Sequence, residues 1–246
     1  MDISSFGGCF VSRTLVHTKG GLRSIEQIRV GDYVLSKPEN GQGEACYRRV
    51  VNTFEYDERE VWYFAFAPLE HDEKTTGKVE FLYVTPGHPF WVKGLRYTDT
   101  IEPFSGWVGA EALRNDYAEA SGFALFELAD GRTAIFRDAG AILKTGNPAI
   151  GLVHGNSFQY GTGIGIDFSK HYPEPLYNDK GRFKELEMDL PEDENYGQPG
   201  AIETVIGRYY PSLRKVYNLE VEDNHTYFVS NAGVLVHTTQ GTVCAI

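Results

Sequence analysis

The chain has 246 residues, enough to bury a full core as one domain or as one domain with an insertion. Its 34 acidic and 23 basic residues give a net charge of −11, which argues against a nucleic-acid surface as the main function. No apolar run approaches the about 20 residues that span a bilayer, and the N-terminus MDISSFGG lacks a signal-peptide pattern. An aromatic content of 13% with many Gly, Val and Thr favours strands joined by tight turns.

The first part of the chain is predicted to be strands joined by turns. We expect one strand over residues 9–18, a turn at KGGL, and a single helical turn over 25–28 with Ser24 at its N-cap. The loop PENGQGEA indicates a hairpin. Strands are predicted for residues 33–36, 48–54, 60–66 and 79–84.

Two segments of the chain resemble each other. IEQIRVGDY is matched by AEALRNDY at the acidic position, the Leu or Ile, the Arg, the Asp and the Tyr, with one residue missing. LVHTKGGL is likewise similar to FWVKGL. This internal similarity predicts a pseudo-twofold β structure built by duplication.

Residues 121–208 are predicted to be an insertion. Its first part indicates a β-hairpin that turns at Asp130 and Gly131. Beyond the hairpin, the sequence is rich in Gly, Asn, Asp and Pro, which indicates long surface loops.

The three cysteines, at positions 9, 46 and 244, cannot form a closed disulfide framework, and none has metal-ligand spacing. At least one thiol must therefore stay free. We expect Cys46 to be a small buried hydrophobe and Cys244, in the tail, to have no role. Cys9 differs because Gly7 and Gly8 precede it and apolar residues follow it, so the carbonyl next to it is unhindered.

Three sequence blocks carry groups that could cut a peptide bond of the chain itself. The run CFVSRTLVHT begins at Cys9, VTPGHPFWV holds Thr85 and His88, and VYNLEVEDNHTYFVSNAGVLVH ends at His237. Together and in this order, the blocks resemble the Hint family, which includes inteins, bacterial intein-like domains and the self-processing part of hedgehog proteins. The resemblance covers about half of the chain and includes both ends.

The resemblance implies an all-β fold: a horseshoe of antiparallel strands with pseudo-twofold symmetry and a loop-rich insertion. It divides the chain into a self-processing domain, an insertion and two flanking segments. The expected boundaries are 1–8 for the N-terminal flank, 9–120 with 209–237 for the Hint domain, 121–208 for the insertion and 238–246 for the C-terminal flank.

The resemblance also implies a reaction at the Gly8–Cys9 peptide bond. Attack of the Cys9 thiolate on the Gly8 carbonyl passes through a five-membered ring and converts the amide into a thioester. Thr85 would position this amide, and His88, with a pKa near neutrality, would give a proton to the departing nitrogen. The alternative is that Thr85 and His88 only satisfy the backbone groups of a Pro-Gly turn.

His237 matches the penultimate histidine that polarises the C-terminal scissile carbonyl in inteins. His225 matches a position that assists later steps, although an ordinary strand histidine is the alternative. The remaining histidines have no second ligand nearby in sequence and are interpreted as surface or packing residues: His17, His71, His154 and His171.

Two positions depart from the family pattern. Thr238 stands where inteins carry the Asn that closes a succinimide, and a threonine hydroxyl cannot form that ring. Full splicing is therefore doubtful, and cleavage before Cys9 is the better prediction. Arg13 stands where many relatives carry Gly, which raises a question about the turn that follows Cys9.

The leading hypothesis is an autocatalytic, single-turnover domain that forms a thioester at Cys9 and loses the preceding segment to water, a thiol or an amine. It needs no cofactor or metal, acts on its own flanking segments, and is expected to be a soluble monomer without nucleic-acid or membrane partners. The sequence of its C-terminal block, VYNLEVEDNHTYFVSNAGVLVH, is similar to that of Hint domains in secreted bacterial toxin systems. The alternatives are a cleavage-inactive module of a larger secreted bacterial protein and a trans-acting Cys/His peptidase, for which no orienting Asn or Asp is evident.

Overall fold

The computed structural model describes residues 8–70, 78–97, 100–117, 122–153, 162–187 and 211–238. Within these ranges the chain forms antiparallel strands, one α-helix, α1 (Ala110–Tyr117), and the 3₁₀ turn Ile25–Gln27. The predicted all-β class is confirmed. The strands, in chain order, are β1 (Phe10–Val11), β2 (Leu15–Thr18), β3 (Gly21–Ser24), β4 (Tyr33–Ser36), β5 (Cys46–Glu60), β6 (Trp62–Pro68), β7 (Glu80–Val84), β8 (Pro89–Tyr97), β9 (Thr100–Glu102), β10 (Gly106–Gly109), β11 (Gly122–Glu127), β12 (Thr133–Lys144), β13 (Ile150–Val153), β14 (Thr162–Asp167), β15 (Glu174–Pro175), β16 (Glu185–Glu187), β17 (Leu213–Val221), β18 (Thr226–Val229) and β19 (Val234–His237).

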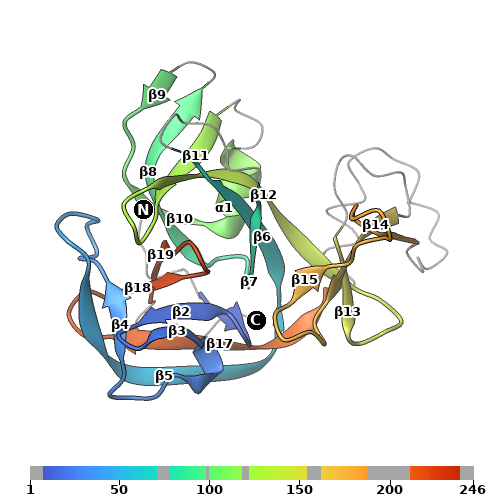
Figure 1. The fold of residues 1–246 in the computed structure, drawn as a ribbon, viewed down its shortest axis with the longest axis horizontal. Helices are drawn as coiled ribbons and strands as arrows, with labels where there is room; N and C mark the ends of the chain where they lie inside the picture. Colours follow the sequence, from blue (N-terminus) through green and yellow to red (C-terminus); the bar gives the residue numbers. More distant parts are fainter. Residues whose placement is uncertain are drawn as a thin grey trace.

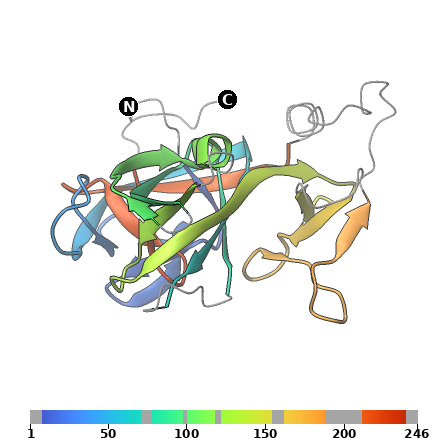
Figure 2. The ribbon, with the colours of Figure 1, turned by 90° about the horizontal axis from the view of Figure 1, so that it is seen from above.

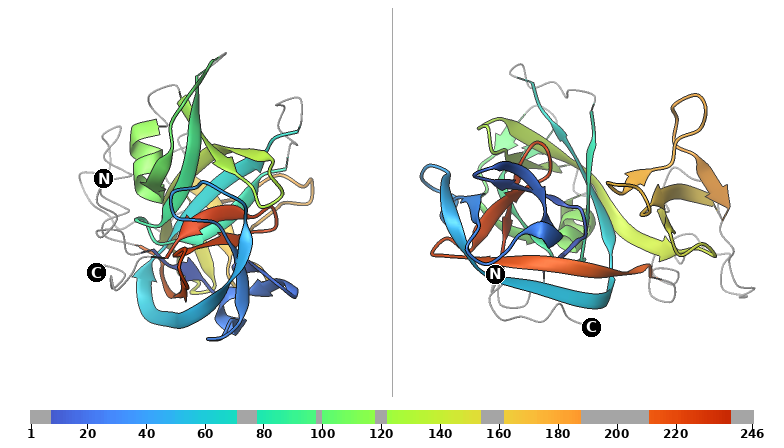
Figure 3. Two further views of the ribbon diagram at one scale, coloured as in Figure 1. Left: turned by 90° about the vertical axis from the view of Figure 1, so that its left-hand side faces the viewer. Right: turned by 60° about the horizontal axis from the view of Figure 1, so that its bottom comes forward.

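Two long strands from opposite ends of the chain support the main body. β5 and β17 pair from Leu213 opposite Glu60 to Val221 opposite Val50, and they curve together along the bottom of Figure 1. Figure 3 shows the same pair wrapping around the side of the molecule. β17 also pairs with β1, so the segment that follows Cys9 is fixed against the C-terminal part of the chain.

The core of the main body is aromatic. Phe64 of β6 lies flat on Phe90 of β8, with ring centroids 3.8 Å apart, and Phe126 of β11 meets Phe64 edge to face at 5.6 Å. All three rings are fully buried. The core therefore joins three strands that are far apart in sequence, and burial of such rings is a main source of stability.

A smaller sheet lies beside the main body. The first part of β12 pairs with β6, whereas its last residues pair with β13, so one strand belongs to both sheets. Among the described strands, β13 to β16 pair with β12 and with one another. Figure 2 shows β12 running from the main body into the smaller sheet. The hairpin of β11 and β12 pairs with β8 and β6, so the part of residues 121–208 that leaves the main sheet begins near Ile142.

Several sequence predictions agree with the structure. The strand predicted for residues 33–36 is β4, and PENGQGEA joins it to β5 as a hairpin. The helical turn after Ser24 is the 3₁₀ turn, although the Ser24 hydroxyl makes no cap hydrogen bond. The hairpin predicted at Asp130 and Gly131 is formed by β11 and β12, and Gly131 supplies the positive φ of 83° that its turn needs.

The prediction of one strand over residues 9–18 is wrong, because a turn at Arg13 divides it into β1 and β2. Arg13 has a φ of 69°, a left-handed conformation that costs a non-glycine residue free energy. The carboxylate of Glu26 accepts a hydrogen bond from the Arg13 N–H at 2.7 Å, and the Thr14 hydroxyl bonds the Val11 carbonyl. These contacts hold a conformation that glycine would adopt without strain.

The two similar segments adopt different local structures. The first copy contains the 3₁₀ turn Ile25–Gln27, and the second copy is α1, a helix of 8 residues. Both follow a strand, β3 and β10 respectively. Pseudo-twofold symmetry stays a prediction. No helix within the described ranges is both long and apolar enough to cross a membrane.

Phe64→Ala should lower the free energy of unfolding by about 3–5 kcal/mol, because it removes a fully buried ring from the aromatic core. Urea unfolding of the reduced protein, followed by fluorescence, measures this loss. Phe123→Ala is the matched control, since its ring is 41% exposed and its loss should cost no more than about 1 kcal/mol. Equal losses in the two variants would contradict this description of the core.

Candidate functional site

The Gly8–Cys9 peptide bond is buried at the start of β1. Phe10 pairs with Val84 of β7, which brings Thr85, the next residue, beside Cys9. The Cys9 N–H donates to Thr85 Oγ1 at 3.0 Å, and the Thr85 N–H donates to the Cys9 carbonyl at 3.0 Å. The sequence analysis predicted that Thr85 positions the amide that precedes Cys9. In the structure the two residues are in direct contact.

The carbonyl of the same peptide bond contacts a residue that sequence reasoning missed. Asn218 Nδ2 of β17 donates to the Gly8 oxygen at 2.6 Å, in a fully buried contact. Both polar atoms of the Gly8–Cys9 peptide bond are therefore bound by side chains. The sequence does hold a sign of this role, an asparagine in the middle of the apolar strand VYNLEV. Asparagine is depleted in strands, and a buried amide needs a hydrogen-bond partner.

Two neighbours fix the orientation of the Asn218 amide. Its Oδ1 accepts from the Leu219 N–H at 2.8 Å and from the Tyr227 hydroxyl at 2.8 Å. Burial raises the pKa of Tyr227 well above its ordinary value, so the hydroxyl keeps its proton. Because Oδ1 already receives two donors, Nδ2 is the atom that the amide presents to Gly8.

His88 lies against the other side of Gly8. Its ring centroid is 4.0 Å from that of Phe10, and its side chain is fully buried. A Cβ atom at position 8 would lie 2.6 Å from His88 Nδ1 and 2.9 Å from Pro89 Cδ, so only glycine fits without a shift. The His88 N–H closes the Pro-Gly turn on the Thr85 carbonyl, but the Thr85 hydroxyl is directed to Cys9 instead.

The expectation of a near-neutral pKa for His88 is wrong. Burial lowers the pKa of His88 to about 3; the charge of His237 acts in the same direction, and the Gly8 backbone opposes it. Neither ring nitrogen makes a hydrogen bond of good geometry within the described residues, although the Gly8 backbone is close enough to oppose the lowering of the pKa. His88 is therefore neutral near pH 7 and can accept a proton before it gives one back.

His237, at the end of β19, is held by a residue from the loop between β4 and β5. Its Nε2 lies 2.6 Å from Glu39 Oε1, and its ring packs on Trp107 with centroids 4.9 Å apart. Trp107 Nε1 in turn donates to the Glu39 carbonyl at 3.0 Å. Burial lowers the pKa of His237, and the hydrogen bond and charge of Glu39 act to raise it.

His225 and Thr238 meet through the backbone. The His225 carbonyl accepts from the Thr238 N–H at 2.7 Å and from its hydroxyl at 3.0 Å. His225 has a φ of 51°, so it lies in a turn between β17 and β18 rather than in a strand. Thr238 is buried, and its hydroxyl is directed to this carbonyl.

The Cys9 sulfur is in a disulfide. Thiolate chemistry at this position therefore requires reduction first. Cys46, the first residue of β5, is free and half-buried, whereas a buried side chain was expected. The prediction for Cys244 lies outside the described residues.

The other histidines contribute little to this site. His17 Nε2 lies 3.0 Å from the Ser230 carbonyl, and His171 is exposed with its ring against Tyr172. His71 and His154 fall outside the described ranges. Within those ranges, no cluster of three or more His, Cys, Asp or Glu residues could hold a metal ion.

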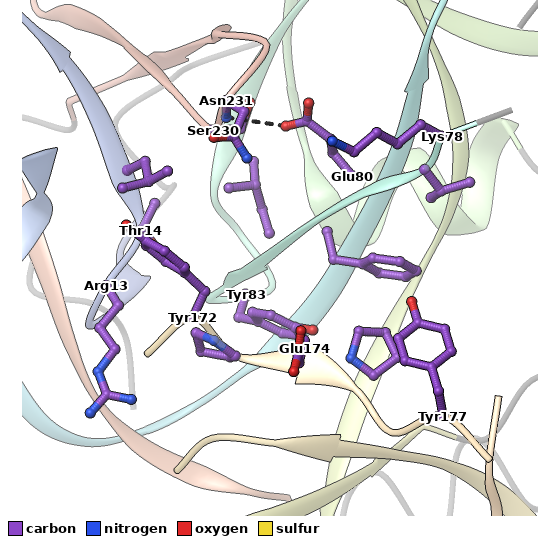
Figure 4. Close-up of a pocket in the computed structure, with 16 residues that line it drawn as sticks. Arg13, Thr14, Lys78, Glu80, Tyr83, Tyr172, Glu174, Tyr177, Ser230 and Asn231 are labelled. Atoms are coloured by element: carbon purple, nitrogen blue, oxygen red, sulfur yellow. Dashed lines mark hydrogen bonds between the residues drawn. The ribbon is translucent and has the colours of Figure 1, made fainter. Parts of the chain in front are cut away.

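A separate cavity of about 270 Å³ lies between the turn after β1 and the smaller sheet. Figure 4 shows Arg13 at one end, Tyr83 in the middle and Tyr177 on the far side. Arg13 also reaches the Ser169 carbonyl at 3.3 Å, which links this turn to the smaller sheet. The cavity is not lined by Cys9, Thr85 or His88, so it is distinct from the site around the Gly8–Cys9 peptide bond.

A scan of protein-family models and a search of curated proteins find no match to the chain. Among solved structures, it is similar to the bacterial intein-like domain from Clostridium thermocellum, with 20% identity and a TM-score of 0.48 over 94% of this chain and 98% of that one. It is also similar to the gp41-1 intein, with 15% identity and a TM-score of 0.43 over 94% of this chain and 99% of that one. A DnaB intein from Synechocystis sp. PCC 6803 has 9% identity and a TM-score of 0.42 over 94% of this chain and 99% of that one. Since these identities are low, we argue the function from the contacts around Gly8 and Cys9.

His88 should make the stability of the fold depend on pH. Burial lowers its pKa from an ordinary value of 6.5 to about 3, so between these values the unfolded chain binds more protons. The stabilisation present above pH 6.5 is lost as the pH falls towards 3, by up to about 1.4 kcal/mol per pH unit. Urea unfolding between neutral and acidic pH should show a shallower dependence for His88→Gln than for the unsubstituted chain. Identical slopes would contradict the buried, neutral state of His88.

Proposed function

We propose that this chain is an autoprocessing domain that converts the Gly8–Cys9 peptide bond into a thioester and then loses the segment before Cys9. One observation carries the proposal: two side chains from distant strands bind the two polar atoms of this one peptide bond, Thr85 the nitrogen and Asn218 the oxygen. An ordinary strand would satisfy these atoms through its ladder. Side-chain partners on both atoms are suited to a bond whose charge distribution changes.

The contacts support a simple N-to-S acyl shift. The reduced Cys9 sulfur attacks the Gly8 carbonyl carbon, a C–S bond forms, and the negative charge that develops on oxygen meets the Asn218 amide. The C–N bond then breaks. The proton of the thiol moves to the departing Cys9 nitrogen, and we propose that the neutral His88, which lies close to Gly8, carries it.

Thr238 limits the reaction to this end of the domain. An intein releases its C-terminal segment through an Asn side chain that attacks its own carbonyl, and a Thr hydroxyl cannot form that ring. Here the Thr238 hydroxyl instead bonds the His225 carbonyl. We therefore propose cleavage before Cys9, with an external nucleophile resolving the thioester, and not splicing.

The Cys9 disulfide favours one alternative function. While its sulfur is oxidised, the domain has no nucleophile and acts as a cleavage-inactive module of a larger protein. The two functions differ in what reduction does. Reduction initiates cleavage in the first case and leaves the chain intact in the second.

Intact-mass spectrometry near neutral pH tests the proposal. With a phosphine reductant, which does not attack thioesters, the chain should lose residues 1–8, and an added thiol should accelerate this loss. Without reductant the mass should stay unchanged, because the Cys9 sulfur is in a disulfide. Cys9→Ala should abolish cleavage, and Cys46→Ala, which removes the free thiol of β5, should cleave normally. Cleavage that persists in Cys9→Ala contradicts the mechanism, and a reduced chain that stays intact supports the inactive module.

Asn218→Ala should slow the reduced reaction by about 10²–10³-fold, because it removes the donor to the developing oxyanion. The rate of loss of residues 1–8, measured with excess thiol, reports this step. Asn52→Ala is the matched control, since it removes an exposed asparagine from β5, the partner strand of β17. A rate close to that of the unsubstituted chain would show that the contact to Gly8 is structural.

A further inference from the structure

The acyl shift leaves a thioester at Cys9 that a nucleophile must then cleave. The shift itself uses neither His237 nor Glu39. Resting on the proposed function, we infer that Glu39 and His237 form a general-base dyad that activates a water molecule to hydrolyse the thioester at Cys9. His237 is the catalytic residue of this step, and Glu39 is the positioning residue. Three features of the pair support this role.

The first feature is the fixed tautomer of His237. A carboxylate only accepts hydrogen bonds, so the 2.6 Å contact between Glu39 Oε1 and His237 Nε2 places the ring proton on Nε2. The lone pair is then on Nδ1. This atom is buried and receives no hydrogen bond within the described residues, and the Thr238 backbone beside it acts to raise the pKa of the ring. A buried acceptor without a partner is destabilising, as expected of a base kept ready for a proton.

The second feature is the position of the ring. Val236 of β19 pairs with Phe90 of β8, so His237 stands across the ladder from Pro89. Pro89 Cδ lies 2.9 Å from the point where a Cβ on Gly8 would be, which puts the Pro89 ring beside the α-carbon of Gly8, the atom bonded to the acyl carbon. His237, Pro89 and Gly8 are therefore successive neighbours.

The third feature is a comparison of the two histidines as bases. His88 has no carboxylate partner, and burial holds its pKa at about 3. His237 has the carboxylate of Glu39 at 2.6 Å, which stabilises the imidazolium that forms when Nδ1 takes a proton. The Glu39 side chain is 42% exposed, so the dyad reaches solvent at its outer end, while the ring of His237 is 6% exposed. His237 is thus the stronger base of the two.

The proposed step balances as a hydrolysis. The water oxygen forms a bond to the Gly8 carbonyl carbon while its proton goes to His237 Nδ1. The bond between this carbon and the Cys9 sulfur breaks, and the thiolate takes the proton back from the imidazolium. The products are a carboxyl group on Gly8 and a free thiol on Cys9.

The test separates hydrolysis from thiolysis in the reduced protein. One reaction contains the phosphine alone, so water is the nucleophile. The other also contains an aryl thiol that is ionised at the assay pH and needs no base. Glu39→Gln and His237→Gln should slow loss of residues 1–8 by about 10²-fold or more in the first reaction. The second reaction should keep the rate of the unsubstituted chain in both variants.

Glu44→Gln is the matched control, since it neutralises an exposed glutamate in the same loop between β4 and β5. It should leave both reactions unchanged. Equal slowing of hydrolysis and thiolysis in Glu39→Gln would assign the pair a structural role and overturn the inference. Hydrolysis at an unchanged rate in Glu39→Gln would also overturn it, whereas an unsubstituted chain that neither reaction cleaves would overturn the proposed function itself.

Discussion

The arrangement of this site depends on how the chain satisfies one buried peptide bond. The Gly8–Cys9 unit enters the core before β1 begins, so its polar atoms need partners that no strand ladder supplies. The Thr85 hydroxyl and the Asn218 amide provide them, and two further hydrogen bonds fix the Asn218 amide. The pairing of β1 with both β7 and β17 exists at just this point. The topology therefore determines the contacts of the site, because β7 leads into Thr85, β17 carries Asn218, and both strands pair with β1.

The two histidines of the site lie in contrasting surroundings. His88 is enclosed by rings and, among the described residues, makes no ion pair, whereas His237 is hydrogen-bonded to Glu39 and reaches towards solvent through it. Environments of this kind separate the proton affinities of chemically identical groups. One histidine therefore lies in a closed apolar space, and the other is linked to solvent through a carboxylate.

Local sequence patterns predicted local structure, and family resemblance predicted the contact between Cys9 and Thr85. β4 was predicted because its apolar alternation lies between two strong turn signals. Asn218 and Glu39 were missed because their roles arise from contacts across 210 and 198 positions of the chain, which no window of sequence can reveal. The burial of His88 was also hidden, since the rings around it come from separate strands. Arg13 was noticed as a departure, and its left-handed backbone explains why glycine suits that position.

The close approach of His88 and Pro89 to the α-carbon of Gly8 has a consequence for whatever precedes this domain. There is no room for a side chain at that position, so any polypeptide joined upstream must end in glycine to be accommodated. In the proposed reaction with an added thiol, the fragment set free would carry a C-terminal glycine thioester, which is achiral at the α-carbon and unhindered towards incoming amines. A domain with this geometry would serve as a tag for producing glycine-ended proteins ready for chemical ligation.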